Sequence, residues 1–288
     1  MRKVINLLLL GILSSLVACH DNDDKGNEQL LKEVKAIDEH LVNSPNYIAY
    51  DGNGSRIEVE QFGNGAPPHL GQTVILEYTA QLFPDGDVIA GGTINDKIEN
   101  IEGTGFRRGV ASILKGSEVN LFVPSAYAYG SKGTDLVPPN KTILYTVHLL
   151  DVIRTEKEQI QFETDTAEIH NFLKDKNINA VLSPGGFWYT IDAVGTGAYP
   201  KVYDGVTFDY KGTLMSNASI FDQGRLTNYN IFNTIDGVKL GTTLVNEGGS
   251  ATFYIPSGLA YGPQGSPPNV PVNSNLIFEV KLNDVANN

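Results

Sequence analysis

The sequence predicts an α+β protein built from two similar domains. Its 288 residues are enough for about two domains, and each half is long enough to bury a core of its own. The apolar share of 41%, with 30 Gly and 14 Pro, fits turn-rich β or α+β domains and argues against disorder. A helix-like segment followed by strand-like segments occurs once in each half, so the order of the elements indicates this fold class twice.

The first half begins with a helical pattern and continues with strands. Apolar residues at helical spacing predict a helix over Asn27–Leu41. Strand-like segments follow at Arg56–Phe62 and Thr73–Leu82, and a short helix is expected over Gly109–Leu114. The half closes with the motif Asn120–Leu149, in which a strand, a Tyr-Gly turn, a Gly/Pro-rich loop and a second strand follow one another.

The second half repeats this plan. Asp165, with Glu168 three residues later, is expected to cap the N-terminus of a helix. Strand-like segments follow at Phe187–Ala193 and Val206–Leu214. The closing motif is Ala251–Val280, with its parts in the same order as in the first half.

A constant offset identifies the two halves as copies. Matching residues lie 132 positions apart in the helix, the strands and the loops, as in Ile37 and Ile169, Tyr78 and Tyr210, or Tyr129 and Tyr261. At the end the offset becomes 133, because the second copy has one more residue in its Gly/Pro-rich loop. We therefore expect one domain over residues 27–153 and another over residues 154–288.

The amino terminus has the features of an export signal. Two basic residues precede an apolar run that is short for a membrane-spanning helix, so residues 1–18 are expected to be a signal peptide. The run ends in Leu16-Val17-Ala18-Cys19, which resembles the lipobox of bacterial lipoproteins, and Cys19 is the only cysteine. The lipid at Cys19 would anchor the protein to a membrane without spanning it. The alternative is a chance cysteine after an ordinary secretory signal.

Residues 19–26 are expected to form a polar tether. They half-resemble a calcium loop, but Lys25 occupies a ligand position and the bidentate Glu is missing, so no metal site is predicted. Acidic residues after a lipidated Cys also resemble surface-export signals of some Bacteroidetes lipoproteins, but we favour the alternative that they form a solvated linker. We expect an envelope protein anchored at the outer membrane, with the periplasmic or surface face left open.

The composition also excludes some functions. A formal charge of −12 argues against nucleic-acid binding, which depends on Lys and Arg. The five histidines are scattered, the mature chain has no free cysteine apart from Cys19, and no GxSxG motif occurs. No cofactor is therefore expected.

Three motifs carry a resemblance to a known family. They are Tyr-x-Gly-x-Leu followed by Phe-Asp, the Pro-Ser-x-x-Ala-Tyr-Gly turn and the Val-Pro loop. Both halves resemble FKBP-type peptidyl-prolyl cis-trans isomerase domains, over Arg56–Val152 and Trp188–Val285, each with a helical extension, as in tandem-domain Bacteroidetes-type lipoproteins. The resemblance implies an antiparallel half-barrel sheet wrapped on one short helix, with a proline pocket between them.

The family's pocket residues carry over best to the second half. The resemblance implies that Asp222 and Tyr261 orient the substrate, Asp222 by accepting from the Tyr210 hydroxyl and Tyr261 by donating to a substrate carbonyl. The backbone N–H of Ile235 is the second donor. The substrate-binding residues implied by the resemblance are Tyr210, Phe221, Ile235, Val238, Val270 and Phe278. Val238 departs from the family pattern, which often has Trp at the pocket floor.

The first half has a poorer match. Ile89-Ala90 replaces Phe-Asp, Gly103 stands where Ile235 lies in the other copy, and Phe106 takes the floor position. This domain is therefore expected to be weak or inactive. Its possible second pocket consists of Tyr78, Phe106, Tyr129, Val137 and Tyr145.

Two functions remain open at this point. The first is prolyl isomerisation in folding polypeptides, mainly by the second domain, through an apolar pocket that favours the twisted amide. The alternative is a non-catalytic module that binds Pro-containing or unfolded segments. On local evidence alone the aromatic residues could be core and Asp222 a turn residue. We expect a monomer whose helical extensions pack on their own domains, and O-glycosylation at Thr166 stays undecided.

Overall fold

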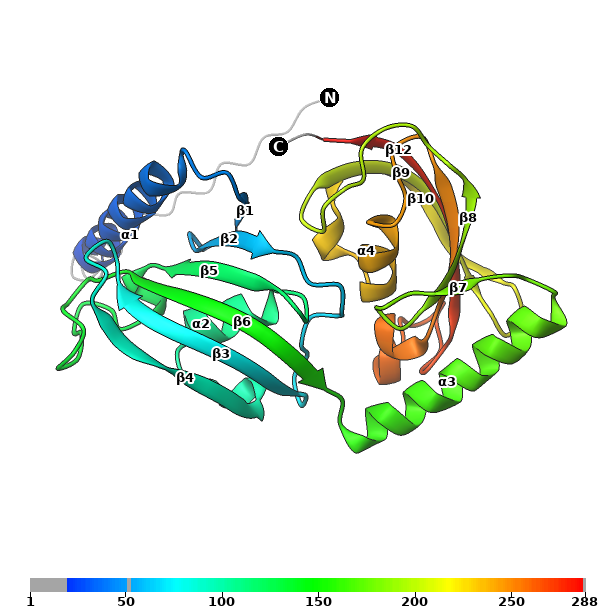
Figure 1. The fold of residues 1–288 in the computed structure, drawn as a ribbon, viewed down its shortest axis with the longest axis horizontal. Helices are drawn as coiled ribbons and strands as arrows, with labels where there is room; N and C mark the ends of the chain where they lie inside the picture. The colour runs from blue at the N-terminus through cyan, green and yellow to red at the C-terminus, as the bar shows by residue number, and fades with distance from the viewer. Residues whose placement is uncertain (1–19, 51–52, 287–288) are drawn as a thin grey trace, which may run out of the picture.

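The protein folds into two lobes joined by a long helix, as Figure 1 shows. The structure, a computed structural model, describes residues 20–50 and 53–286. The first lobe, domain 1, comprises α1 (His20–Leu41), β1 (Tyr47–Tyr50), β2 (Arg56–Gln61), β3 (Thr73–Leu82), β4 (Val88–Lys97), α2 (Thr104–Ala111), β5 (Glu118–Val123) and β6 (Ile143–Ile153). The second, domain 2, comprises α3 (Glu156–Asp175), β7 (Val181–Leu182), β8 (Trp188–Ala193), β9 (Gly205–Leu214), β10 (Ile220–Asn230), α4 (Asp236–Thr242), β11 (Ser250–Ile255) and β12 (Leu276–Val285).

Each domain is built on one six-stranded antiparallel sheet. The strand order is β1-β2-β5-β6-β3-β4 in domain 1 and β10-β9-β12-β11-β8-β7 in domain 2. Strands β7 to β12 match β1 to β6 one for one, so the two orders are the same when one is read from the opposite edge. The predicted α+β class and the duplication of one domain are confirmed.

The strand before each Pro-Ser turn is covered on both faces. In β5, Leu121 points into the main core, whereas its neighbour Phe122 points to the opposite face and packs with Ile37 of α1. In β11, Tyr254 packs in the same way with Ile169 of α3. Because both faces are buried, the sequence is continuously apolar here. Each helical extension therefore packs on its own domain.

Helix α3 begins earlier than the sequence predicts. It starts at Glu156, and Thr155 forms the N-cap: the Thr155 hydroxyl accepts from the Glu158 N–H, and the Glu158 carboxylate accepts from the Thr155 N–H at 2.8 Å. The prediction that Asp165 caps this helix is wrong. A capping-box pattern occurs at both places, and the tertiary contacts of Asp165 give it a different role.

Asp165 is a buried clamp between α3 and the Pro-Ser turn. Its carboxylate accepts from the N–H of Ser257 at 2.9 Å and from the Ser257 hydroxyl at 2.6 Å. Glu33 of α1 accepts from the N–H and the hydroxyl of Ser125 in the same way, both at 2.6 Å. Hydrogen bonds to a buried charged group are each worth about 1.5–3 kcal/mol. The clamp therefore fixes the turn that leads to Tyr261 in domain 2.

Two other elements differ from the prediction. The short helix expected at Gly109–Leu114 is α2, Thr104–Ala111, and a Cβ at Gly109 would overlap the Leu121 side chain. Helix α1 extends back to His20, through most of the segment expected as a tether. Cys19 and the predicted signal peptide lie outside the described residues. Within the described residues, no helix combines the length and apolar character needed to cross a bilayer.

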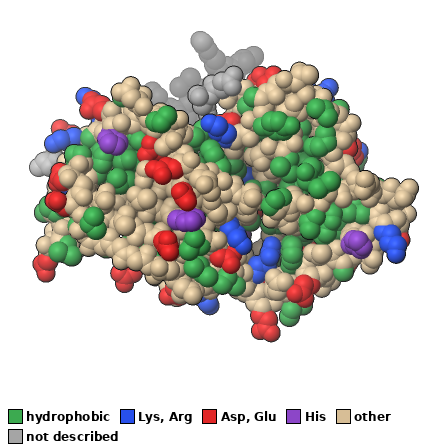
Figure 2. Space-filling model, viewed as in Figure 1, with side chains coloured by type: hydrophobic (Ala, Val, Ile, Leu, Met, Phe, Trp, Pro, Cys, Tyr) green, Lys and Arg blue, Asp and Glu red, His purple; other side chains and the backbone are tan. Residues whose placement is uncertain are grey.

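The two domains contact each other directly. The Tyr203 hydroxyl of domain 2 donates to the backbone carbonyl of Ser112 in domain 1 at 2.7 Å. The Tyr203 ring also stacks on Tyr47, with ring centroids 5.9 Å apart. Figure 2 shows side chains of both charge signs along the lower part of the junction. The relative position of the domains is therefore held by both apolar and polar contacts.

Candidate functional site

A β-bulge positions Phe221 in domain 2. Strand β10 pairs with β9 at Ile220 and at Asp222, and the register shifts between them, so Phe221 is the extra residue of the bulge. Its ring lies over Gly212 of β9, where an added Cβ would be 2.5 Å from the ring. Gly212 therefore leaves the space that the Phe221 ring occupies.

Three aromatic rings meet around this bulge, and two valines of the predicted site are buried in the same core cluster. The Phe221 ring meets Phe278 edge-on at 5.6 Å and Tyr261 edge-on at 6.2 Å between centroids. Val238 of α4 and Val270 of the Gly/Pro-rich loop are 3% and 2% exposed. The structure therefore brings together residues that the sequence predicts as substrate-binding from a bulge, a helix, a loop and a strand.

The two tyrosine hydroxyls of the site have different environments. The Tyr210 hydroxyl donates to the Asp222 carboxylate at 3.0 Å, which is the pairing that the family resemblance implies. Burial, followed by the Asp222 carboxylate, raises the pKa of Tyr210 to about 12. Burial, with a smaller contribution from Asp222, also raises the pKa of Tyr261. Among the described residues, none accepts a hydrogen bond from the Tyr261 hydroxyl, so this protonated phenol is available as a donor.

Ile235 stands at the start of α4. It is the N-cap residue in an extended conformation, with φ −60° and ψ 149°, and its carbonyl accepts from the Lys239 N–H at 2.9 Å. Its side chain is partly buried against the core. The role of its N–H as a substrate handle stays a prediction.

Domain 1 has the same bulge but different side chains around it. Strand β4 shifts register between Ala90 and Val88, so Ile89 is the bulged residue. Ala80 of β3 stands 132 positions before Gly212, and it therefore carries the methyl group that Gly212 lacks. A phenylalanine at position 89 would meet this methyl group. Gly103, the N-cap of α2, has φ +83°, a conformation that strains any other residue.

The floor of the domain 1 site is filled by aromatic rings. Phe106 of α2 stacks on Tyr145 with centroids 4.3 Å apart and planes 13° apart, and lies 5.3 Å from Tyr78. Burial, and next the neighbouring Tyr129, raise the pKa of Tyr145. Val137 is buried, whereas Tyr129 is 43% exposed. Domain 1 thus has the stacked ring of Phe106 at the position where domain 2 has the smaller Val238.

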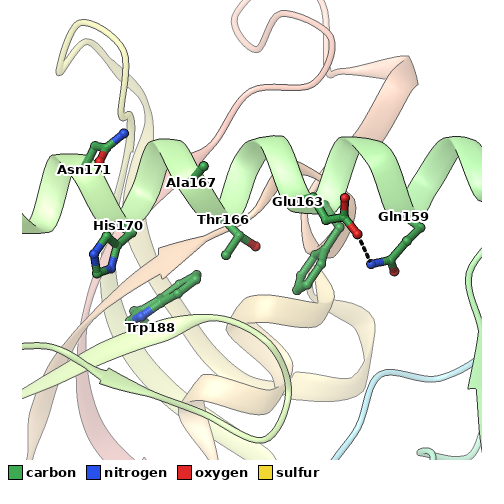
Figure 3. A pocket seen from close by; sticks show the side chains of 8 residues that line it. Gln159, Glu163, Thr166, Ala167, His170, Asn171 and Trp188 are labelled. Atoms are coloured by element: carbon green, nitrogen blue, oxygen red, sulfur yellow. Dashed lines mark hydrogen bonds between the residues drawn. The ribbon is translucent and has the colours of Figure 1, made fainter.

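Clefts that the sequence did not indicate lie elsewhere. One of about 410 Å³ runs under α3 and is lined by Phe162, Thr166 and Trp188, among others. Figure 3 shows it, with the 2.9 Å hydrogen bond from Gln159 to Glu163 at its rim. The Thr166 hydroxyl oxygen is buried there without a hydrogen-bond partner among the described residues. Two further clefts, of about 470 and 490 Å³, lie between the domains.

Comparisons with known proteins agree with the duplicated fold. The profile of the FKBP-type peptidyl-prolyl cis-trans isomerases matches residues 65–150 and 197–283. The chain is 33% identical over 133 residues to a probable FKBP-type peptidyl-prolyl cis-trans isomerase FkpA of Neisseria meningitidis serogroup B, covering 44% of this chain and 48% of that protein. It is 30% identical over 174 residues to FkpA of Escherichia coli, covering 57% and 62%. The chain thus spans about half to three fifths of the length of these relatives.

Solved structures of the same kind are also similar. The crystal structure of FkpA from Escherichia coli is 25% identical and covers 46% of this chain and 63% of its own, with a TM-score of 0.39. The structure of the three FKBP domains of wheat FKBP73 is 18% identical and covers 84% of this chain and all of its own, with a TM-score of 0.35.

Proposed function

The chain belongs to the FKBP-type peptidyl-prolyl cis-trans isomerase family, with one family domain in each half, and from this premise we propose that it isomerises X–Pro bonds in polypeptides. We assign the activity to domain 2. The observation that carries this assignment is the joint presence in domain 2 of the bulged Phe221, the Tyr210–Asp222 hydrogen bond and an unengaged Tyr261 hydroxyl. In domain 1 the first two are absent, because Ile89-Ala90 replaces Phe221-Asp222.

The chemistry needs no nucleophile. The planar amide is held by resonance with a rotation barrier of about 18–20 kcal/mol, and X–Pro bonds interconvert over tens to hundreds of seconds. In the twisted transition state the resonance is lost and the charge separation falls, so an apolar surrounding favours it over the planar amide. Phe221, Phe278 and buried Val270 would provide that surrounding and hold the pyrrolidine ring.

The polar groups would orient the substrate rather than exchange protons. Tyr261 would donate to a substrate carbonyl, and its raised pKa keeps the phenol protonated at neutral pH. Asp222 would hold Tyr210 in the wall through the observed hydrogen bond. Since no group of the site has to change its ionisation, this mechanism does not itself demand a pH optimum.

The test compares matched tyrosines in the full chain. Tyr261→Phe removes one hydroxyl from domain 2, and Tyr129→Phe removes the matching hydroxyl from domain 1. In an assay of the isomerisation of an Ala-Leu-Pro-Phe peptide, we expect Tyr261→Phe to lower kcat/KM by about 3- to 10-fold, the value of one hydrogen bond. Tyr129→Phe should leave kcat/KM unchanged. A wild-type chain that does not accelerate the reaction would refute catalysis and leave the binding module as the function.

We further propose that the protein works in the bacterial envelope, held by lipid at Cys19. The support is the lipobox-like sequence before Cys19 and the apolar run that precedes it. Cys19→Ser should release the protein from membranes into the soluble fraction. Continued membrane association of this variant, measured by fractionation, would count against a lipid anchor.

A further inference from the structure

The start of α4, which borders the proposed site, is buried against domain 1. Asp236 is the first residue of α4 and follows Ile235 directly, while Val238 of the pocket floor is two residues further on. The Asp236 side chain is only 7% exposed. Thr104, the matching first residue of α2 in domain 1, is exposed. Only one of the two helix starts is therefore covered by the other domain.

One side chain from each domain holds the Asp236 carboxylate. Lys239, one helical turn along α4 and itself buried, donates to one oxygen at 2.8 Å. His69 of domain 1 approaches the other oxygen with its Nε2 at 2.7 Å. Because Lys239 already compensates the charge of Asp236 within domain 2, α4 does not depend on His69 to fold. The contact with His69 additionally fixes the position of the start of α4 relative to domain 1.

The loop that carries His69 is itself anchored. The His69 N–H donates to the Gln72 side chain at 3.1 Å, and the Gln72 carbonyl accepts from the Ile98 N–H at 3.0 Å. The Gln72 amide also donates to Glu158 of α3 at 3.4 Å. The imidazole is thus presented to Asp236 from a rigid loop.

A second contact supports the same segment from the other side. Phe232, three residues before Ile235, stacks on Tyr203 with centroids 5.1 Å apart, and Tyr203 in turn stacks on Tyr47 of domain 1. The Lys239 ammonium lies 4.3 Å from the centre of the Phe232 ring. Domain 1 therefore contacts Asp236 directly, after Ile235, and is linked to Phe232, before Ile235, through Tyr203 of domain 2.

We propose that domain 1 acts as a positioning module for the domain 2 site, and that His69 is the positioning residue that holds Asp236 and through it the Ile235 N–H and the Val238 floor. This inference rests on the proposed function of domain 2. It gives the domain with the poorer pocket a role in catalysis that needs no substrate of its own. His69 acts through Asp236 and does not touch the substrate.

The ionisation of the pair sets a direction for the effect of pH. The hydrogen bond to Asp236 raises the pKa of His69 above its ordinary 6.5, against burial and Lys239, with Glu158 adding to the rise. Burial opposes the ionisation of Asp236, but His69 and Lys239 outweigh it, so the pKa of Asp236 lies below its ordinary value. Lys115 and Arg154 line the same cleft. The stabilisation that protonated His69 gives to the contact with Asp236 is therefore complete below pH 6.5. It is lost as the pH rises through the raised pKa of His69.

The test uses the full chain and three variants. His69→Ala removes the contact, and His69→Gln keeps a neutral donor. His148→Ala is the matched control, since His148 also lies in domain 1, pairs with Glu118 at 3.8 Å and lines neither of the clefts between the domains. Near pH 6 we expect His69→Ala to lower kcat/KM by about 5- to 10-fold, because the Ile235 N–H and Val238 would no longer be held in position. As the pH rises and His69 becomes neutral, the activity of the wild type should fall toward that of His69→Gln, since both side chains then offer an uncharged donor to Asp236. His69→Gln should restore most of the activity without that pH dependence, and His148→Ala should match the wild type.

A second measurement separates this inference from the proposed function. Amide hydrogen exchange over residues 231–242 should be faster in His69→Ala than in the wild type and in His148→Ala. If the wild type proves inactive, the affinity for the Ala-Leu-Pro-Phe peptide replaces kcat/KM, and a several-fold loss confined to His69→Ala would still support positioning. The positioning role would be overturned if His69→Ala changed neither the amide exchange nor kcat/KM or affinity. It would also be overturned if His69→Ala lowered the melting temperature without a pH-dependent change in kcat/KM or affinity.

Discussion

Gly212→Ala should disable the domain 2 site while leaving the domain folded. The new Cβ would lie 2.5 Å from Cζ of Phe221 and 3.0 Å from both Cε atoms, closer than atoms in contact can approach. The ring cannot move into the pocket, because Phe278 and Tyr261 stand 5.6 and 6.2 Å away. It must therefore swing outward and leave the wall.

The energetic consequences of this substitution can be separated. Overpacking costs about 1–3 kcal/mol, while replacing Gly by Ala in an extended strand recovers about 0.4–1 kcal/mol from the unfolded state. The net loss of stability should therefore be about 0–2.5 kcal/mol. Losing the Phe221 contact in the transition state, worth about 1.4 kcal/mol as part of a buried aromatic contact, would lower kcat/KM by about tenfold.

The assay compares Gly212→Ala with Gly258→Ala. Both replace a domain 2 glycine by the residue of domain 1 at the matching position, Ala80 or Ala126. An added Cβ at Gly258 meets nothing within 4 Å, so peptide isomerisation by this control should be unchanged. Full activity in Gly212→Ala, together with unchanged NMR signals of the Phe221 ring, would show that the ring is not placed as described or does not matter.

Three further predictions follow from the same geometry. Ile89→Phe with Ala90→Asp can be grafted into domain 1 of a chain whose domain 2 is weakened by Asp222→Ala and Tyr261→Phe. This graft should add no isomerase activity until Ala80→Gly makes room for the ring, and added activity without Ala80→Gly would contradict this steric account. Tyr210→Phe should cost about 0.5–1.5 kcal/mol of stability in urea unfolding and lower kcat/KM by about 2- to 5-fold. Because burial and the Asp222 carboxylate raise the pKa of Tyr210 to about 12, the ratio of kcat/KM between the wild type and Tyr210→Phe should stay constant from about pH 6 to 9. A ratio that changes in this range would point to another group. Asp165→Ala should destabilise domain 2 by about 2–4 kcal/mol, because Ser257 loses two charge-assisted hydrogen bonds. The control Glu163→Ala, on the exposed side of α3, should change stability by about 0.5 kcal/mol or less. Equal effects of the two substitutions would refute the clamp.

The sequence predicts the helical extension of domain 2 correctly but assigns Asp165 the wrong role in it. The offset matches Ile169 to Ile37 as a helix residue, and Ile169 lies on the buried side of α3. Asp165 was read as a cap, although Thr155 and Glu158 form the same local pattern upstream. Local pattern could not choose between the two, because the contact that decides the role of Asp165 comes from Ser257, far along the chain. The offset of 132 that relates Glu33 to Asp165 and Ser125 to Ser257 was the signal that could have revealed the clamp.

The sequence by itself determined the duplicated α+β fold, and the set of residues that it proposes for the domain 2 site stays a prediction. The sequence could determine the fold because strand periodicity and the constant offset are properties of the chain that survive without coordinates. Only the tertiary structure decided that Gly212 makes room for Phe221, that Phe106 fills the first site by stacking, and that His69 reaches Asp236. Each of these depends on the distance between atoms of segments remote in sequence, and such distances are set by the packing of the whole fold rather than by any local pattern.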